Sequence, residues 1–164
     1  MLARAQHGDL PGATVLSLDD VVAASLAARA DAIAARNLTV SRAGDPAGAR
    51  VAGSTELIRR MVDNVLDNAI IHNDAGGWIH VSTASCDAEV YLVMDNGGGV
   101  LDPGLARELA QPFRRFGADR TTSGRGAGLG LSIVAAIAAA HHGTLELLAR
   151  PAGGLRVRIG LPPA

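Results

Sequence analysis

Three polar side chains recur at every fourth position in one segment of this sequence. Asn64, Asn68 and His72 lie in the stretch RRMVDNVLDNAIIHN, whose apolar residues repeat at helical spacing. Side chains four residues apart share one line along a helix, so these three should border the buried face. One interpretation is a row of solvated polar residues at that edge. The other is a row of neutral ligands, because asparagine carbonyls suit Mg²⁺ when phosphates supply its remaining oxygens.

A carboxylate stands at the end of a predicted strand. Asp95 closes the apolar run EVYLVMD and is followed by Asn96 and three glycines. One interpretation is an ordinary turn. The other is a buried carboxylate that accepts a hydrogen bond from an exocyclic amine, while Gly97 and Gly99 let a flat ring approach the backbone.

Glycines alternate with other residues in SGRGAGLGLSIV, directly before a long apolar segment. The stretch is not a P-loop, because that motif requires a lysine and the sequence contains none. It is not a dinucleotide fingerprint either, since the spacing is G-x-G-x-G and the stretch lies late in the chain. It is either a flexible hinge or a helix start whose backbone N–H groups hold phosphate oxygens.

The segment QPFRRFG, ahead of these glycines, carries both phenylalanines of the chain. Phe113 and Phe116 are core anchors under a loop in the plainer interpretation. Four arginines flank the loop and could each reach a phosphate: Arg114, Arg115, Arg120 and Arg125.

The composition limits the classes of protein that this chain can represent. Its 164 residues are 48% hydrophobic but only 2% aromatic, which predicts one domain with an aliphatic core. A net charge of −1 gives no sign of affinity for nucleic acid or an anionic membrane. A single cysteine excludes an internal disulfide, and no apolar run reaches the roughly 18 residues of a membrane span. We therefore expect a cytoplasmic chain without direct membrane contact.

The order of predicted elements indicates the fold class. Strands are expected at 14–16, LTVS and ARVAG, and hairpins at GGWIHVSTAS with EVYLVMDN and at TLELLA with LRVRIGLP. Ser17 or Asp19 should cap a helix that carries Val22, Leu26 and Ile33, and Ser54 or Thr55 should cap the asparagine helix. Without strict βαβ alternation, this favours a two-layer α/β sandwich with a mixed, mostly antiparallel sheet under helices. Breakers in residues 1–13 predict a linker or the tail of an upstream helix before a domain at 14–164.

Taken in this order, the segments resemble the ATP-binding catalytic domain of sensor histidine kinases, in the superfamily shared with gyrase, Hsp90 and MutL. NVLDNAIIH resembles the N box, DNGGGV the G1 box, PFRRF the F box and GAGLGLSIV the G2 box. The resemblance extends from about residue 16 to 162. It implies a Bergerat fold that holds Mg²⁺-ATP between the helical layer and a flexible lid. Two positions depart from the pattern: Gly98 replaces a common proline, and Ile71 a common basic residue.

The resemblance also implies a role for each motif residue. Asn64 would coordinate Mg²⁺, Asn68 would contact the phosphates, and His72 would lie beside them. Asp95 would bind the adenine amino group. Further contacts to ATP are implied for Gly97, Gly99, Phe113, Gly126, Gly128, Leu129 and Gly130, with Arg115 approaching the γ-phosphate. Since a lid orders only on nucleotide, residues 117–126 should be poorly ordered without it.

The implied activity is transfer of the γ-phosphoryl group to a histidine. ATP-hydrolysing relatives place a glutamate base one helical turn before the metal asparagine, and this chain has Arg60 there. No acceptor histidine is visible, because His7 lies in a breaker-rich stretch. The acceptor would lie on a dimerisation domain, upstream or on a separate chain, and a response regulator would be an indirect partner. The alternatives are a serine kinase of the anti-sigma type and a non-catalytic nucleotide-binding docking module.

Overall fold

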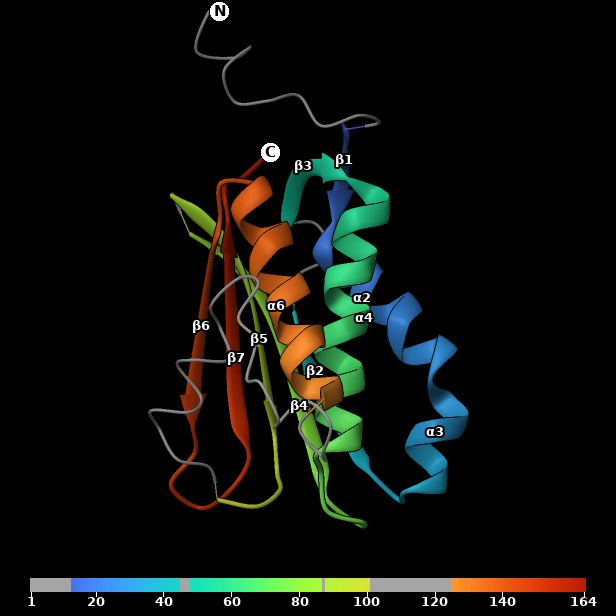
Figure 1. The fold of residues 1–164 in the computed structure, drawn as a ribbon. Coiled ribbons are helices and arrows are strands. Elements are labelled where there is room, and N and C mark those ends of the chain that lie inside the picture. Colours follow the sequence, from blue (N-terminus) through green and yellow to red (C-terminus); the bar gives the residue numbers. More distant parts are fainter. Residues whose placement is uncertain (1–12, 45–47, 87, 101–124) are drawn as a thin grey trace, which may run out of the picture.

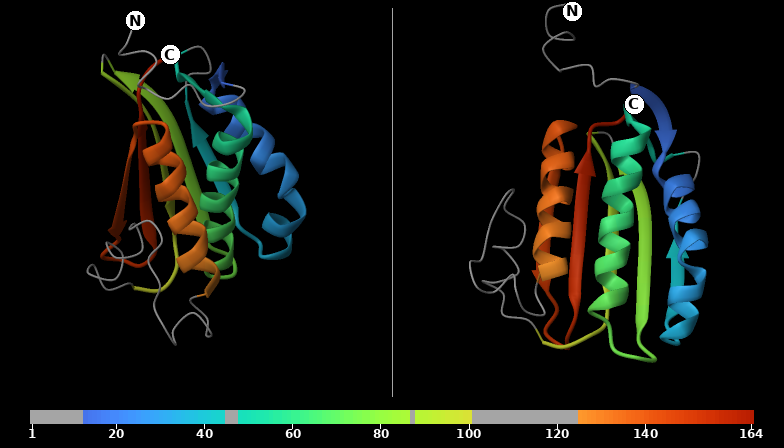
Figure 2. Two further views of the ribbon diagram at one scale, coloured as in Figure 1. Left: turned by 45° about the horizontal axis from the view of Figure 1, so that its top comes forward. Right: turned by 45° about the vertical axis from the view of Figure 1, so that its right-hand side comes forward.

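The computed structural model describes residues 13–44, 48–86, 88–100 and 125–164, and side chains within 125–129 are not described. It forms two layers, in which helices lie along one face of a five-stranded sheet (Figures 1 and 2). The elements are β1 (Ala13–Ser17), α2 (Leu18–Ala28), α3 (Ala30–Ala35), β2 (Thr39–Ala43), β3 (Arg50–Ser54), α4 (Thr55–Ile71), β4 (Trp78–Cys86), β5 (Glu89–Asn96), α6 (Arg125–Ala140), β6 (Thr144–Ala149) and β7 (Leu155–Leu161).

The large sheet has the strand order β2-β4-β5-β7-β6. Strand β2 runs parallel to β4, and every other neighbouring pair in this sheet is antiparallel. Strands β1 and β3 form a separate antiparallel pair. The predicted hairpins are β4–β5 and β6–β7, and the two-layer sandwich with a mixed, mostly antiparallel sheet is confirmed.

The first predicted helix is divided in two. Ser17 caps α2 as expected, because its Oγ accepts a hydrogen bond from the Asp20 N–H at 3.3 Å. The helix then ends at Arg29, whose backbone (φ −110°, ψ 15°) leaves helical geometry before α3 begins. The expectation of one helix carrying both Val22 and Ile33 was therefore wrong at this break.

Helix α4 begins where the sequence indicates. The Oγ of Ser54 accepts a hydrogen bond from the Leu57 N–H at 3.2 Å, and helical residues continue to Ile71. The apolar stripe of α4, which includes Met61 and Val65, is almost fully buried. In the helical layer α4 lies between α2 on one side and α6 on the other (Figure 2).

The two faces of the large sheet differ in polarity. On β5, Val90, Leu92 and Met94 are each 1% exposed and belong to the core under the helices. Tyr91 and Val93 point to the opposite face and are partly exposed. Because strand side chains alternate in direction, every second residue of β5 shares one of these faces.

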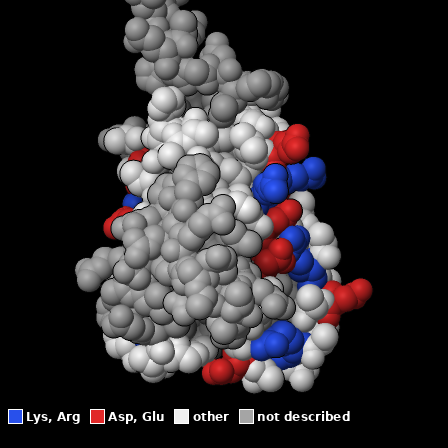
Figure 3. All heavy atoms as spheres, in the orientation of Figure 1, with Lys and Arg blue, Asp and Glu red and all other residues white. Residues whose placement is uncertain are grey.

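The visible surface carries charged side chains of both signs. Figure 3 shows basic and acidic side chains next to one another along the flank of the helices. Among the described helices, none is long and apolar enough to cross a membrane. Cys86, the last residue of β4, is exposed.

Candidate functional site

Two buried amide atoms on α4 have no hydrogen-bond partner within the part of the chain that the structure describes. They are the Nδ2 of Asn64 and the Oδ1 of Asn68. The side chain of Asn68 is only 8% exposed, so water does not readily replace a partner. Buried polar groups in folded proteins are almost always paired, and an exception indicates a ligand, ion or water that belongs there. The line of asparagines therefore has the property of a binding surface rather than of a solvated edge.

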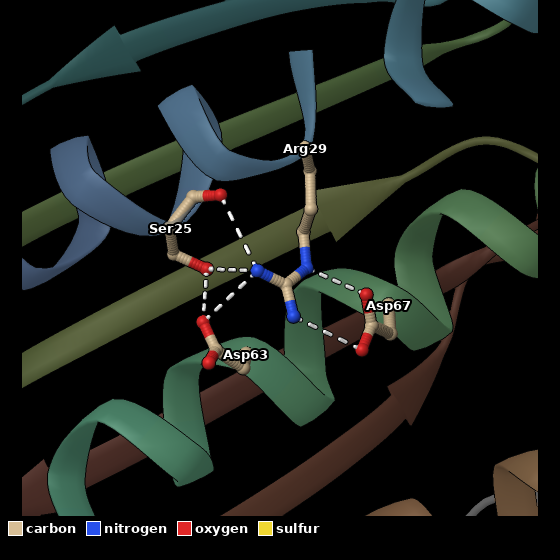
Figure 4. A network of polar contacts seen from close by, with 4 residues as sticks. All are labelled: Ser25, Arg29, Asp63 and Asp67. Atoms are coloured by element: carbon tan, nitrogen blue, oxygen red, sulfur yellow. Dashed lines mark hydrogen bonds and ion pairs between the residues drawn. The ribbon is translucent and has the colours of Figure 1, made fainter. Parts of the chain in front are cut away.

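The two aspartates that precede these asparagines form ion pairs with α2. Asp63 and Asp67 face α2, where Arg29 approaches both of them (Figure 4). The Nε of Arg29 lies 2.6 Å from Oδ1 of Asp67, and its Nη1 lies 3.1 Å from Oδ1 of Asp63. Ser25 donates a further hydrogen bond to Asp63 at 2.6 Å. The hydrogen bond to Asp67 raises the pKa of Arg29, so this cluster joins α2 to α4 as a permanent ion pair.

Helix geometry separates the asparagines from this cluster. Each residue of an α-helix is rotated by about 100° from the one before it. Asn64 and Asn68 each follow one of the two aspartates, so they lie on the flank of α4 that is turned away from α2. Helix α6 packs on that side (Figure 2).

The glycine-rich stretch forms the first turns of α6. The helix begins at Arg125, so Gly126, Gly128 and Gly130 are already helical. These turns lie beside the C-terminal half of α4, since the two helices run antiparallel (Figures 1 and 2). A Cβ atom added at Gly130 would meet nothing within 4 Å, which shows open space there. The free N–H groups of a helix start attract anions, so this end of α6 can complete a phosphate site next to Asn68.

His72 terminates α4 next to this line. Its backbone N–H donates to the carbonyl of Asn68 at 3.1 Å, and its side chain is exposed at the helix end. Desolvation by the surrounding protein lowers the pKa of His72 from its ordinary value of 6.5. Desolvation therefore disfavours the charged imidazole, so His72 is a poor replacement for the basic residue that is common at the position of Ile71.

Asp95 is a buried carboxylate near the end of β5, as the sequence analysis expects. The residue is 5% exposed, and by strand alternation its side chain points to the face of the sheet opposite the helices. There it meets Arg156 of β7, whose Nε and Nη2 donate to the two carboxylate oxygens at 2.7 and 2.9 Å. Arg150 approaches the same carboxylate at 3.7 Å. The expectation that Asp95 binds an adenine amino group stays a prediction, and in this structure both carboxylate oxygens accept hydrogen bonds from Arg156.

The residue at the end of β5 that faces the helices is Asn96. It lies two positions after Met94, between Ile79 of β4 and Leu155 of β7, and is 3% exposed. Its Nδ2 donates to the carbonyl of Gly97 at 2.6 Å. The sequence alone does not indicate which way this residue points, because the apolar run of β5 shows no clear alternation.

Gly98 brings the end of β5 to the end of α4. Its φ of +143° is a conformation that L side chains rarely adopt, and an added Cβ would lie 2.5 Å from the carbonyl oxygen of His72. A proline at this position is excluded by that φ. Gly97 packs against the indole of Trp78, whereas Gly99 borders open space. Gly98, between the two glycines that the sequence analysis selected, therefore packs against the backbone of His72 at the end of α4.

The structure does not describe some of the predicted site residues. Phe113 and Arg115 lie outside the described residues, as does most of the predicted lid at 117–126. The side chain of Leu129 is likewise not described. Within the described residues, no group of three His, Cys, Asp or Glu side chains could hold a metal ion. Amide oxygens suit a divalent ion whose remaining ligands are phosphate oxygens, and Asn68 offers an unpaired Oδ1, whereas Asn64 would offer an oxygen only after a half turn of its amide.

Comparison with known sequences identifies relatives over most of the chain. Residues 53–164 match the family described as "Histidine kinase-, DNA gyrase B-, and HSP90-like ATPase". The chain is 40% identical to the sensor protein CutS of Streptomyces coelicolor over 120 residues, which are 73% of this chain and 29% of CutS. It is 43% identical to the sensor histidine kinase component HK1 of Mycobacterium tuberculosis over 107 residues, which are 64% of this chain and 60% of HK1. The chain thus spans less than two thirds of either relative.

Solved structures of similar fold cover nearly the whole chain. The mycobacterial sensor histidine kinase MprB superposes with a TM-score of 0.74 at 26% identity, over 91% of this chain and 96% of that one. The nucleotide-free catalytic domain of the histidine kinase ThkA gives 0.78 at 20% identity, over 92% and 96%. The fold, the order of the motifs and the family match agree, and the chain belongs to the family of histidine kinase-, DNA gyrase B- and HSP90-like ATPases, as the ATP-binding domain of the sensor histidine kinase type.

Proposed function

We propose that this chain binds Mg²⁺-ATP and transfers the γ-phosphoryl group to a histidine on a partner domain or chain. The observation that carries the proposal is the pair of unpaired amide atoms of Asn64 and Asn68 on one flank of α4. The oxygen and nitrogen of an amide exchange places by a half turn, so each side chain can offer an oxygen to a cation or an N–H to a phosphate. Asn64 would hold Mg²⁺ and Asn68 the phosphates.

Bound Mg²⁺ would neutralise charge on the phosphate oxygens during transfer. The chain itself would supply position and further charge stabilisation. The N–H groups at the start of α6 would donate to phosphate oxygens, and neutral His72 could donate one hydrogen bond. Positive charge would come from an arginine of the segment before α6, and Arg115 is our candidate for the γ-phosphate.

Transfer is favoured over hydrolysis by the placement of the carboxylates. Water attack on ATP is helped by a general base within reach of the water. The position one turn before Asn64 is Arg60. The nearest carboxylates along α4, Asp63 and Asp67, are held by Arg29 on the side turned toward α2. The asparagine flank of α4 therefore presents no carboxylate that could activate water.

The partner would be a domain that carries the acceptor histidine, upstream in the same polypeptide or on a separate chain. The match covers only 29% of CutS, which supports an acceptor histidine outside the matched domain. A response regulator would receive the phosphoryl group afterwards, and ThkA has been solved in complex with the response regulator protein TrrA. Because the reaction consumes ATP, we place it in the cytoplasm.

Labelled ATP tests the proposal. The chain is incubated with [γ-³²P]ATP, Mg²⁺ and a separately produced dimerisation domain that carries an acceptor histidine. We expect label on the partner that is lost in acid and retained in alkali, as phosphohistidine is. Asn64→Ala should lower the rate by about a hundredfold. Acid-stable label would indicate a serine kinase instead, and nucleotide binding without any label would indicate a docking module.

A further inference from the structure

Helix α4 carries a further polar residue on the line that contains the asparagines. Arg60 precedes Asn64 by four residues, the same spacing that separates Asn64 from Asn68. Along this line Asn68 is buried, Asn64 is half-buried and Arg60 is exposed. We propose that Arg60 binds the γ-phosphate of the nucleotide and supplies a permanent positive charge that Ile71 does not. The inference rests on the proposed function, because it concerns a further residue of the same nucleotide site.

Most arginines in the described part of the chain are engaged with other groups. A carboxylate or a backbone carbonyl accepts a contact from each of Arg29, Arg36, Arg42, Arg150, Arg156 and Arg158. Within the described residues, Arg50, Arg59 and Arg60 make no ion pair or side-chain hydrogen bond. Arg50 lies on β3, and Arg59 is turned by about 100° from Arg60 around α4. Of these three side chains, only that of Arg60 is on the asparagine line.

The acidic residues close to Arg60 along α4 do not neutralise its charge. Asp63, three residues later, is held by Arg29 and Ser25. Glu56, one turn earlier, is exposed and forms no ion pair with any described residue. A guanidinium group stays charged at physiological pH and can donate two parallel hydrogen bonds to a phosphate. Arg60 is therefore available to an anionic ligand.

The terminal phosphate belongs at the Asn64 end of the line. The first turns of α6 lie beside the C-terminal half of α4, where their N–H groups can meet phosphates near Asn68 (Figures 1 and 2). Since Mg²⁺ bridges β- and γ-phosphate oxygens, an ion at Asn64 has the terminal group beside it. Helical side chains lean toward the N-terminus, so the amide of Asn64 lies over the turn that carries Arg60. Cβ atoms four residues apart are separated by about 6 Å, which an arginine side chain spans.

Arg60 suits the terminal phosphate better than His72, which lies at the other exposed end of the line. A phosphoryl group that passes to a partner must be accessible, and both ends meet this condition. Desolvation lowers the pKa of His72 and so disfavours its charged form. The guanidinium of Arg60 keeps its charge, and it therefore stabilises the γ-phosphate more strongly.

The test compares the affinities of the chain for Mg²⁺-ATP and Mg²⁺-ADP, which differ by the γ-phosphate. In calorimetric titrations, Arg60→Ala should weaken ATP binding about tenfold and change ADP binding by less than about twofold. Arg60→Lys should restore part of the affinity for ATP, because the positive charge returns. Arg60 is exposed, so the midpoint of thermal unfolding should be the same in both variants and in the unmodified chain.

The matched control is Arg59→Ala, which removes the same charge from the adjacent exposed position and should leave both affinities unchanged. Equal effects of Arg59→Ala and Arg60→Ala would overturn the inference, as would equal weakening of ATP and ADP in Arg60→Ala. A fall of the ATP/ADP preference in His72→Ala but not in Arg60→Ala would place the γ-phosphate at the other end and also overturn it. In all these outcomes the proposed function stands. An unmodified chain that binds neither nucleotide would overturn the proposed function, and the inference with it.

Discussion

Asp95 of β5 and Arg156 of β7 face each other across neighbouring strands and form a two-pronged ion pair on the open face of the sheet. Asp95 is the buried partner, with 8% of its side chain exposed against 47% for Arg156. The hydrogen bonds to Asp95 raise the pKa of Arg156, which stabilises the charged guanidinium. The pair joins the neighbouring strands β5 and β7.

Replacing Arg156 should lower the stability of the folded chain. Arg156→Ala leaves the buried carboxylate with the more distant Arg150 alone. We expect the free energy of unfolding to fall by about 1–2 kcal/mol, less than for a fully buried pair because Arg156 is half exposed. Urea unfolding measures this loss. The double variant Asp95→Ala/Arg156→Ala should recover part of it, and an undiminished loss would show that the pair does not act as a unit.

Gly98 should tolerate substitution far less than its neighbour Gly99. Gly98→Ala imposes an unfavourable φ and a clash with the His72 carbonyl, at an expected cost of about 1–3 kcal/mol. Gly99→Ala enters open space, so it should change stability by less than about 0.5 kcal/mol. Thermal unfolding of the two variants compares them directly. Equal midpoints would contradict the close approach of β5 to α4.

His141 should behave as a structural residue that links α6 to α4. Its Nε2 accepts a hydrogen bond from the Ser54 N–H at 3.2 Å, and its Nδ1 lies 2.8 Å from the Ile137 carbonyl. His141→Ala would leave the Ser54 N–H without its acceptor and open a cavity, at about 2–3 kcal/mol. Chemical denaturation gives the loss. The neighbouring His142→Asn, at an exposed position with φ +60°, should cost much less.

The lowered pKa of His72 predicts a pH dependence of definite sign. The folded state binds this proton less readily than the unfolded state, whose histidine titrates near 6.5. Stability is therefore lost as the pH falls through 6.5 toward the lowered folded value, and it is complete above 6.5. NMR titration should give His72 a midpoint below 6.5. His72→Gln should remove part of the acid-side loss, and a midpoint above 6.5 would contradict the desolvation.

Much of the scaffold follows from local sequence signals. Ser17 and Ser54 are serines ahead of apolar helical patterns, and both cap their helices through the side chain. The asparagine line was also predictable, because a fourfold spacing fixes a shared flank once α4 is helical. That two of its atoms are buried without partners could not be predicted, since burial depends on the packing of α4 among its neighbours.

The face of β5 could not be predicted with the same certainty. Tyr91 and Val93 are as suited to a core as Val90, Leu92 and Met94, so the apolar run shows no clear alternation. Only the pairing of β5 with β4 and β7 decides which set is buried, and with it the faces to which Asp95 and Asn96 point. The break between α2 and α3 at Arg29 could not be predicted from local sequence either. Arg29 leaves helical geometry and makes ion pairs to α4, and such contacts depend on the tertiary fold.

The most direct test of the account is a titration of the chain with ATP, with and without Mg²⁺, in the unmodified form and in Asn68→Ala. The account predicts one bound ATP, tighter binding with Mg²⁺, and at least about tenfold weaker binding in Asn68→Ala. Arg29→Ala, which disturbs the opposite flank of α4, should lower stability but leave ATP affinity near that of the unmodified chain. Equal affinity in Asn68→Ala, or binding indifferent to Mg²⁺, would contradict a nucleotide site built on the asparagine line of α4.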